Sequence, residues 1–142
     1  MEEDAPQPDT HLWILPEYGG QARMEGPYPC GAPELATEIC RSSTSYDLHQ
    51  KMDLYRSAGV QEYVAILLRE REVRWHRLVG GDYELLPVSP KGIICSVIFP
   101  GLWLEVQPFL DGDMRRVLKT LNRGLKSPEH AAFVAELARR KS

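Results

Sequence analysis

Alternating apolar and polar residues predict a β-strand over residues 34–40. Side chains two positions apart lie on the same face of a strand. The pattern therefore divides the segment between two faces, with Leu35, Thr37 and Ile39 on one and Glu34, Ala36, Glu38 and Cys40 on the other. Glu38 lies in the middle of this strand, where burial of an unpaired charge would be costly, so it is the first candidate for chemistry.

The apolar residues that follow adopt a helical spacing. Residues 47–58 carry Leu48, Met52 and Tyr55 on one stripe, as expected of an amphipathic helix. Residues 63–68 are then apolar throughout, which is typical of a strand covered on both faces. A strand, a helix and a buried strand in this order predict a crossover connection within one sheet.

The second half of the chain predicts a meander and then helices. Gly80-Gly81 separates two alternating segments, which is a hairpin signature. We expect Gly124 to end the first C-terminal helix and Ser127 to cap the second. The glycine- and proline-rich residues 17–33 predict a loop or an irregular hairpin. The remaining predicted strands are residues 11–15, 73–78, 83–86 and 95–99, and the predicted helices are residues 113–123 and 128–140.

Together these elements predict an α/β fold, with a mixed sheet, a crossover helix, a β-meander and C-terminal helices. Residues 1–110 are expected to form the main domain, and residues 111–142 a helical extension of it. A chain of 142 residues is long enough to bury one hydrophobic core.

Composition changes this picture little. The chain is 43% hydrophobic and 26% charged, which is typical of a soluble globular protein. No apolar run is long enough to cross a bilayer, and the acidic N-terminus is unlike a signal peptide. Three scattered cysteines suit neither a disulfide framework nor a zinc site, so we expect a cytoplasmic protein. With a net charge of −3, any nucleic-acid surface must be a local patch.

Several short motifs occur in an order that resembles a known family. They are Pro8-Asp9, Ala32-Pro33-Glu34-Leu35 leading into Thr37-Glu38-Ile39, the Ser42-Ser43-Thr44 turn, Asp47-Leu48 with Lys51, Tyr55 with Ala58-Gly59-Val60, Glu62-Tyr63, and Phe99-Pro100-Gly101-Leu102. In this order they resemble the Uma-type putative restriction endonucleases, a bacterial branch of the PD-(D/E)XK nuclease superfamily. The resemblance runs from about Pro8 to Leu104, and it implies a restriction-endonuclease-like fold.

The resemblance also implies an activity, the hydrolysis of DNA phosphodiester bonds by a metal-dependent endonuclease. In that case Asp9 and Glu38 bind Mg²⁺, and Lys51 stabilises negative charge on the phosphate as the third catalytic residue. This chemistry suits the residue types, because Mg²⁺ takes hard oxygen ligands and needs only one or two carboxylates. Restriction-type nucleases often act as dimers, so the resemblance also implies a homodimer.

Two features depart from the superfamily pattern. The usual lysine lies two residues after the acid, and Cys40 occupies that position here. Lys51, at the edge of the helical stripe, is the substitute that the family pattern indicates. In addition, only eight residues precede Asp9, whereas the superfamily core begins with a helix and a strand. We therefore expect a shortened core whose Asp9 strand is an edge that favours association, unless an upstream segment or a partner completes it.

Other interpretations stay open. The rival function is a catalytically inactive remnant, or an interaction protein, of the same fold. Asp47 and Lys51 are four residues apart and could form an ordinary pair on a helix surface. Glu34 lies on the same strand face as Glu38 and is a secondary candidate for the site.

Overall fold

The structure is a computed structural model, and it describes residues 8–141. No helix within these residues is long and apolar enough to cross a membrane. The elements are β1 (Thr10–Leu12), η2 (Pro16–Tyr18), β2 (Arg23–Glu25), β3 (Tyr28–Cys30), β4 (Leu35–Cys40), α1 (Tyr46–Ala58), β5 (Glu62–Leu67), β6 (Glu72–Val79), β7 (Asp82–Leu85), β8 (Ile93–Cys95), β9 (Trp103–Glu105), α2 (Val106–Asp111), α3 (Met114–Leu125) and α4 (Pro128–Arg140).

The main sheet has five strands in the order β1-β4-β5-β6-β7. Strands β4 and β5 are parallel and are joined by α1, while the other neighbouring pairs are antiparallel. The predicted α/β fold, with a mixed sheet, a crossover helix, a meander and C-terminal helices, is confirmed. β1 lies at one edge of the sheet and all three of its residues are exposed.

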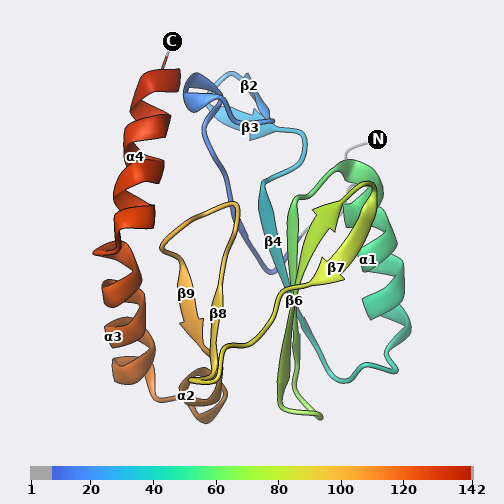
Figure 1. Cartoon of the computed structure of the whole chain (residues 1–142). Helices are drawn as coiled ribbons and strands as arrows, with labels where there is room; N and C mark the ends of the chain where they lie inside the picture. Colours follow the sequence, from blue (N-terminus) through green and yellow to red (C-terminus); the bar gives the residue numbers. More distant parts are fainter. Residues whose placement is uncertain (1–7, 142) are drawn as a thin grey trace.

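Two apolar layers cover the sheet (Figure 1). Helix α1 covers one face, where the buried cluster includes Leu48, Tyr55 and Tyr63. The β8–β9 hairpin lies on the other face, with α3 and α4 outside it (Figure 1). The second cluster lies there and includes Trp75 and Ile94.

The predicted alternation in β4 is present. Ala36, Glu38 and Cys40 are buried, and Ala36 and Cys40 belong to the α1-side cluster. Leu35 points to the opposite face and packs in the second cluster. Ile39, on the same side as Leu35, is 55% exposed, so only part of that face is covered.

Several predicted boundaries were wrong. The strand predicted over residues 11–15 is β1, which ends at Leu12, and the strand predicted over 95–99 is β8, which ends at Cys95. Gly124 lies inside α3 and does not end it. A Cβ on Gly124 would lie 2.2 Å from the Gly101 carbonyl oxygen, so the glycine allows close packing of the helix on a neighbouring turn.

Candidate active site

Glu38 lies in the middle of β4 and is 2% exposed. The alternation of the strand turns its side chain toward α1, into a layer that is otherwise apolar. A carboxylate in such a place must have partners, because an uncompensated buried charge is strongly unfavourable.

Helix α1 supplies those partners. Tyr55 donates its hydroxyl hydrogen to Glu38 Oε1 at 2.7 Å, and Lys51 Nζ lies 3.1 Å from the same oxygen. Lys51 and Tyr55 are one helical turn apart, so they share the face that meets the sheet. The Lys51 side chain is 40% exposed, so it connects the buried carboxylate to the surface.

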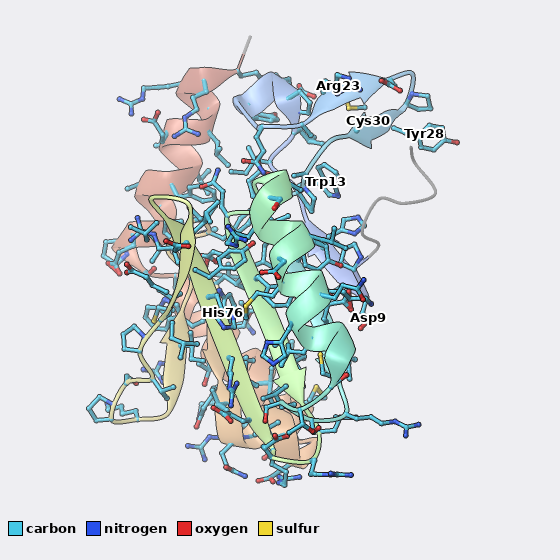
Figure 2. The ribbon with its side chains drawn as sticks, turned by 90° about the vertical axis from the view of Figure 1, so that its right-hand side faces the viewer. Asp9, Trp13, Arg23, Tyr28, Cys30 and His76 are labelled. Atoms are coloured by element: carbon cyan, nitrogen blue, oxygen red, sulfur yellow. The ribbon has the colours of Figure 1, made fainter. Side chains whose placement is uncertain are left out.

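Asp9 reaches the same region from β1. Its N–H donates to the Thr37 carbonyl at 3.0 Å, and its Oδ2 accepts a hydrogen bond from the Ile39 N–H at 2.7 Å. The β1–β4 register pairs Thr10 with Thr37, and continuing it by one residue places Asp9 opposite Glu38 on the neighbouring strand. Because backbone N–H groups of a strand point along the sheet, the bond from Ile39 holds the Asp9 carboxylate at the sheet edge, beside β4. Asp9 is exposed, and Figure 2 shows it beside α1.

The electrostatics of Glu38 reflect these neighbours. Burial raises the pKa of Glu38, the hydrogen bond from Tyr55 and the Lys51 ammonium lower it, and the negative charge of Asp9 raises it again. The net result is a pKa above the ordinary value. Asp9 is therefore close enough for its charge to act on Glu38.

A row of rings extends the site along the α1-side layer. The Tyr63 ring lies 5.3 Å from the Tyr55 ring, 5.6 Å from the His76 ring and 5.9 Å from the Tyr83 ring, as measured between centroids. Figure 2 shows His76 beside α1 in the sheet layer. The Tyr63 hydroxyl is buried and has no hydrogen-bond partner within residues 8–141. Burial raises the pKa of Tyr63 and lowers the pKa of His76, so both side chains are neutral near pH 7.

The residues present fit a Mg²⁺ ion at the level of donor chemistry. Asp9 and Glu38 are hard oxygen donors on neighbouring strands, and their mutual repulsion is what a divalent cation would offset. Residues 8–141 contain no group of three or more His, Cys, Asp and Glu residues that could hold a metal. Mg²⁺ commonly retains several waters and binds through one or two carboxylates, so two donors are sufficient.

The structure brings Lys51 to Glu38 and places Asp9 across from it, but it gives Glu34 a different setting. Glu34 Oε1 accepts from the Ile14 N–H and Oε2 from the Gln21 N–H, both at 2.8 Å. These bonds tie the chain after β1 to the beginning of β4, which is a structural role.

Sequence reasoning missed the part played by Tyr55. The helical spacing placed Tyr55 on the apolar stripe, and its ring does pack in the α1-side cluster. Its hydroxyl, however, holds the Glu38 carboxylate. The available signal was its position one turn after Lys51, since both side chains then point to the same strand.

Comparison with known proteins bears on the family of this chain. No curated protein matches the chain. A family model, Uma2, described as putative restriction endonuclease, matches residues 1–107. The match includes Asp9, just before β1, as well as Glu38 on β4 and Lys51 on α1. The chain belongs to the Uma2 family of putative restriction endonucleases.

Proposed function

We propose that this protein is a Mg²⁺-dependent endonuclease that hydrolyses DNA phosphodiester bonds, with Asp9, Glu38 and Lys51 as its catalytic residues. The observation that supports this most is the 3.1 Å contact of Lys51 Nζ with Glu38 Oε1, with Asp9 on the adjacent strand. Two carboxylates and one amine in one region of the molecule are the groups that metal-dependent phosphodiester hydrolysis needs. Membership of the Uma2 family supports DNA as the substrate.

Asp9 and Glu38 would hold the metal through their carboxylate oxygens. Bound Mg²⁺ supplies a Lewis acid for the phosphoryl oxygen and lowers the pKa of a water molecule that can attack the phosphorus. The roles of the two acids differ, because Asp9 is exposed whereas Glu38 is 2% exposed. Asp9 is accessible from solvent, and Glu38 forms the fixed inner wall of the site.

Lys51 and Tyr55 would act around Glu38. Tyr55 fixes the orientation of the carboxylate through its hydroxyl and is therefore a positioning residue. Lys51 is half-exposed and carries a positive charge on a long flexible chain. That charge stabilises the negative charge that develops on the phosphate oxygens during the reaction. With substrate bound, Lys51 would exchange part of its contact with Glu38 for one with the phosphate.

The test measures the rate at which the whole chain and three variants cleave plasmid and linear duplex DNA in millimolar Mg²⁺. Glu38→Gln and Lys51→Met should each lower the rate by about 100-fold or more, the range found when one group that stabilises transition-state charge is removed. Glu84→Gln, which changes an exposed acid on β7, should cut at the wild-type rate.

A binding measurement separates this proposal from the inactive-remnant alternative. Mg²⁺ should raise the melting temperature of the wild type and of Glu84→Gln, but not that of Asp9→Asn or Glu38→Gln, because an ion that binds only the folded state stabilises it. If wild-type protein neither cuts DNA nor gains stability in Mg²⁺, the remnant interpretation is correct.

A further inference from the structure

Helix α3 has an inner face and an outer face of opposite character. Thr120 and Gly124 are buried on the inner face. The outer face carries a shallow open groove of about 490 Å³, formed by side chains of α3 and its C-cap. The groove is lined by Arg115, Leu118, Lys119, Asn122, Arg123 and Lys126. Four of these six side chains are cationic and none is acidic.

The charge of this segment is unusual for the chain. Residues 114–126 contain five lysine and arginine residues and no aspartate or glutamate, although the whole chain has a net charge of −3. Arg116, which lies off the groove, forms an ion pair with Glu105. Within residues 8–141, the groove residues Arg115, Lys119 and Lys126 form no salt bridge, so their charges face solvent unneutralised.

The neighbouring helix α4 differs from α3 in how its cations are paired. The two arginines in the last turn of α4, Arg139 and Arg140, both pair with Glu136 on the same helix. Internal pairing of this kind leaves little charge for a partner. In α3 the cations instead repel one another along one face, an arrangement that an anionic partner would relieve.

The spacing of these cations suits a phosphate chain. Arg115, Lys119 and Arg123 follow one another at intervals of four residues, which are about 6 Å apart along a helix. Such a row of cationic side chains presents hydrogen-bond donors at regular intervals, as the phosphates of a nucleic-acid backbone also recur at regular intervals. Arginine in particular binds phosphate through two parallel hydrogen bonds. The groove residues include no aromatic ring, so stacking on unpaired bases is not available there.

We propose that the outer face of α3 binds the phosphate backbone of double-stranded DNA. The choice of DNA among polyanions rests on the proposed nuclease function. This surface lies outside residues 1–107, which match the family model, and α3 lies on the opposite side of the sheet from α1 (Figure 1). The groove therefore contacts a different stretch of DNA from the one at Glu38, and it increases affinity without reading sequence.

An anionic membrane is the main competing partner for such a face. Met114, Leu118 and Leu125 are 46%, 55% and 43% exposed, which gives the helix some apolar surface beside its cations. Interfacial helices, however, bury a continuous apolar face in the lipid. Here the inner face of α3 is buried against the protein, at Thr120 and Gly124, and Leu118 is the single apolar residue that lines the groove. The cations outnumber it, which favours DNA.

The test measures binding of a labelled DNA duplex to the whole chain by fluorescence anisotropy in EDTA, where no cleavage occurs. The variant Arg115→Gln/Lys119→Gln/Lys126→Gln is compared with Arg69→Gln/Arg77→Gln/Lys91→Gln, which removes the same charge from exposed positions elsewhere. Each phosphate contact contributes about 0.9 to the slope of log K against log salt. The α3 variant should therefore lose about 2.7 from that slope and bind roughly tenfold more weakly or worse at low salt.

The control triple variant should keep nearly the wild-type slope. Equal losses in the two variants would overturn the proposal, because only net charge would then matter. Binding of wild type to phosphatidylserine vesicles but not to duplex DNA would overturn it in favour of a membrane. Glu38→Gln is measured in the same assay: if it binds DNA like wild type yet cannot cut, both proposals hold. If wild type never cuts but binds through α3, only the nuclease proposal fails.

Discussion

Glu38 and Glu62 lie buried on adjacent parallel strands of one sheet, but they point to opposite faces and are held differently. Glu62 is 0% exposed and its carboxylate is saturated by four neutral donors. Glu38 is 2% exposed and has one hydroxyl donor, one half-exposed cation and a nearby acid. The four donors to Glu62 are Trp75 Nε1 at 2.9 Å, Ser96 Oγ at 2.6 Å, and the N–H groups of Val97 at 2.8 Å and Ile98 at 2.9 Å.

The difference shows which buried acid is structural and which is available for chemistry. Three of the bonds to Glu62 come from residues 96–98 in the connection between β8 and β9, and the fourth comes from Trp75 on β6, so its environment is closed. Glu38 is instead held at one oxygen by Tyr55 and by Lys51, a side chain that can swing into solvent. Incomplete pairing with a second carboxylate nearby is costly for folding, and such arrangements concentrate at functional sites.

Replacing Glu62 should have the largest effect. Glu62→Ala leaves the Val97 and Ile98 N–H groups and the Trp75 indole without acceptors in the core. Each buried donor that loses its acceptor typically costs about 1–3 kcal/mol, so the lost bonds together amount to about 3–5 kcal/mol. We expect a loss of that size in the free energy of unfolding, measured by urea denaturation at pH 7. Glu84→Ala, at an exposed position, should change it by less than about 0.5 kcal/mol. An equally small loss for Glu62→Ala would contradict the structural role.

Of the two buried acids, only Glu38 could be singled out from the sequence. The strand, helix and strand from 34 to 68 were predicted well because their signals are local, in periods of two and 3.6 and in a C-cap at Gly59, whose φ is 88°. Glu38 and Lys51 also emerged from position alone. The anchoring of Glu62 could not, because its donors lie 13 to 36 residues further along the chain.

In the second half of the chain, glycine and proline residues account for most of the errors in the predicted helices and strands. Gly124 resembled a helix end, but its packing against Gly101 and Trp103 is a tertiary contact that the sequence does not display. The six-residue helix α2 escaped prediction because it is short and contains Pro108. Such elements depend on what they pack against, so local propensity is a weak guide to them.

Removing the Tyr55 hydroxyl should have an intermediate effect. Tyr55→Phe keeps the buried ring but deletes the 2.7 Å hydrogen bond to Glu38 Oε1. Hydrogen bonds to charged groups contribute about 1.5–3 kcal/mol, so a loss of about 1.5 kcal/mol in the free energy of unfolding is expected once the pH is high enough to ionise Glu38. Because that bond lowers the pKa of Glu38, the pKa should rise further in the variant, as followed by carboxyl-carbon NMR. Tyr83→Phe, which affects a bond to the Val60 carbonyl, should leave the Glu38 titration in place.

Neutralising Glu38 should have the smallest effect and the opposite sign. Burial raises the pKa of Glu38 above its value in the unfolded chain, so the folded state holds this proton more tightly. The free energy of unfolding of the wild type therefore falls as the pH rises from the unfolded-state pKa to the folded-state pKa. Glu38→Gln does not titrate there, and its amide oxygen can still accept the Tyr55 hydrogen bond.

The difference in the free energy of unfolding between Glu38→Gln and wild type should accordingly be near zero in acid. It should grow through that pH interval and level off above it. We expect a final gain of about 1 kcal/mol, the lower end of what is found when a buried ionic group is replaced by a neutral one of similar shape. Lys51, being 40% exposed, can turn to solvent once its partner is neutral, so it does not cancel the gain. Urea denaturation of both proteins from pH 4 to pH 8.5 measures this difference. A variant that becomes less stable than wild type as the pH rises would mean that Lys51 and Tyr55 compensate Glu38 as fully as the four donors compensate Glu62.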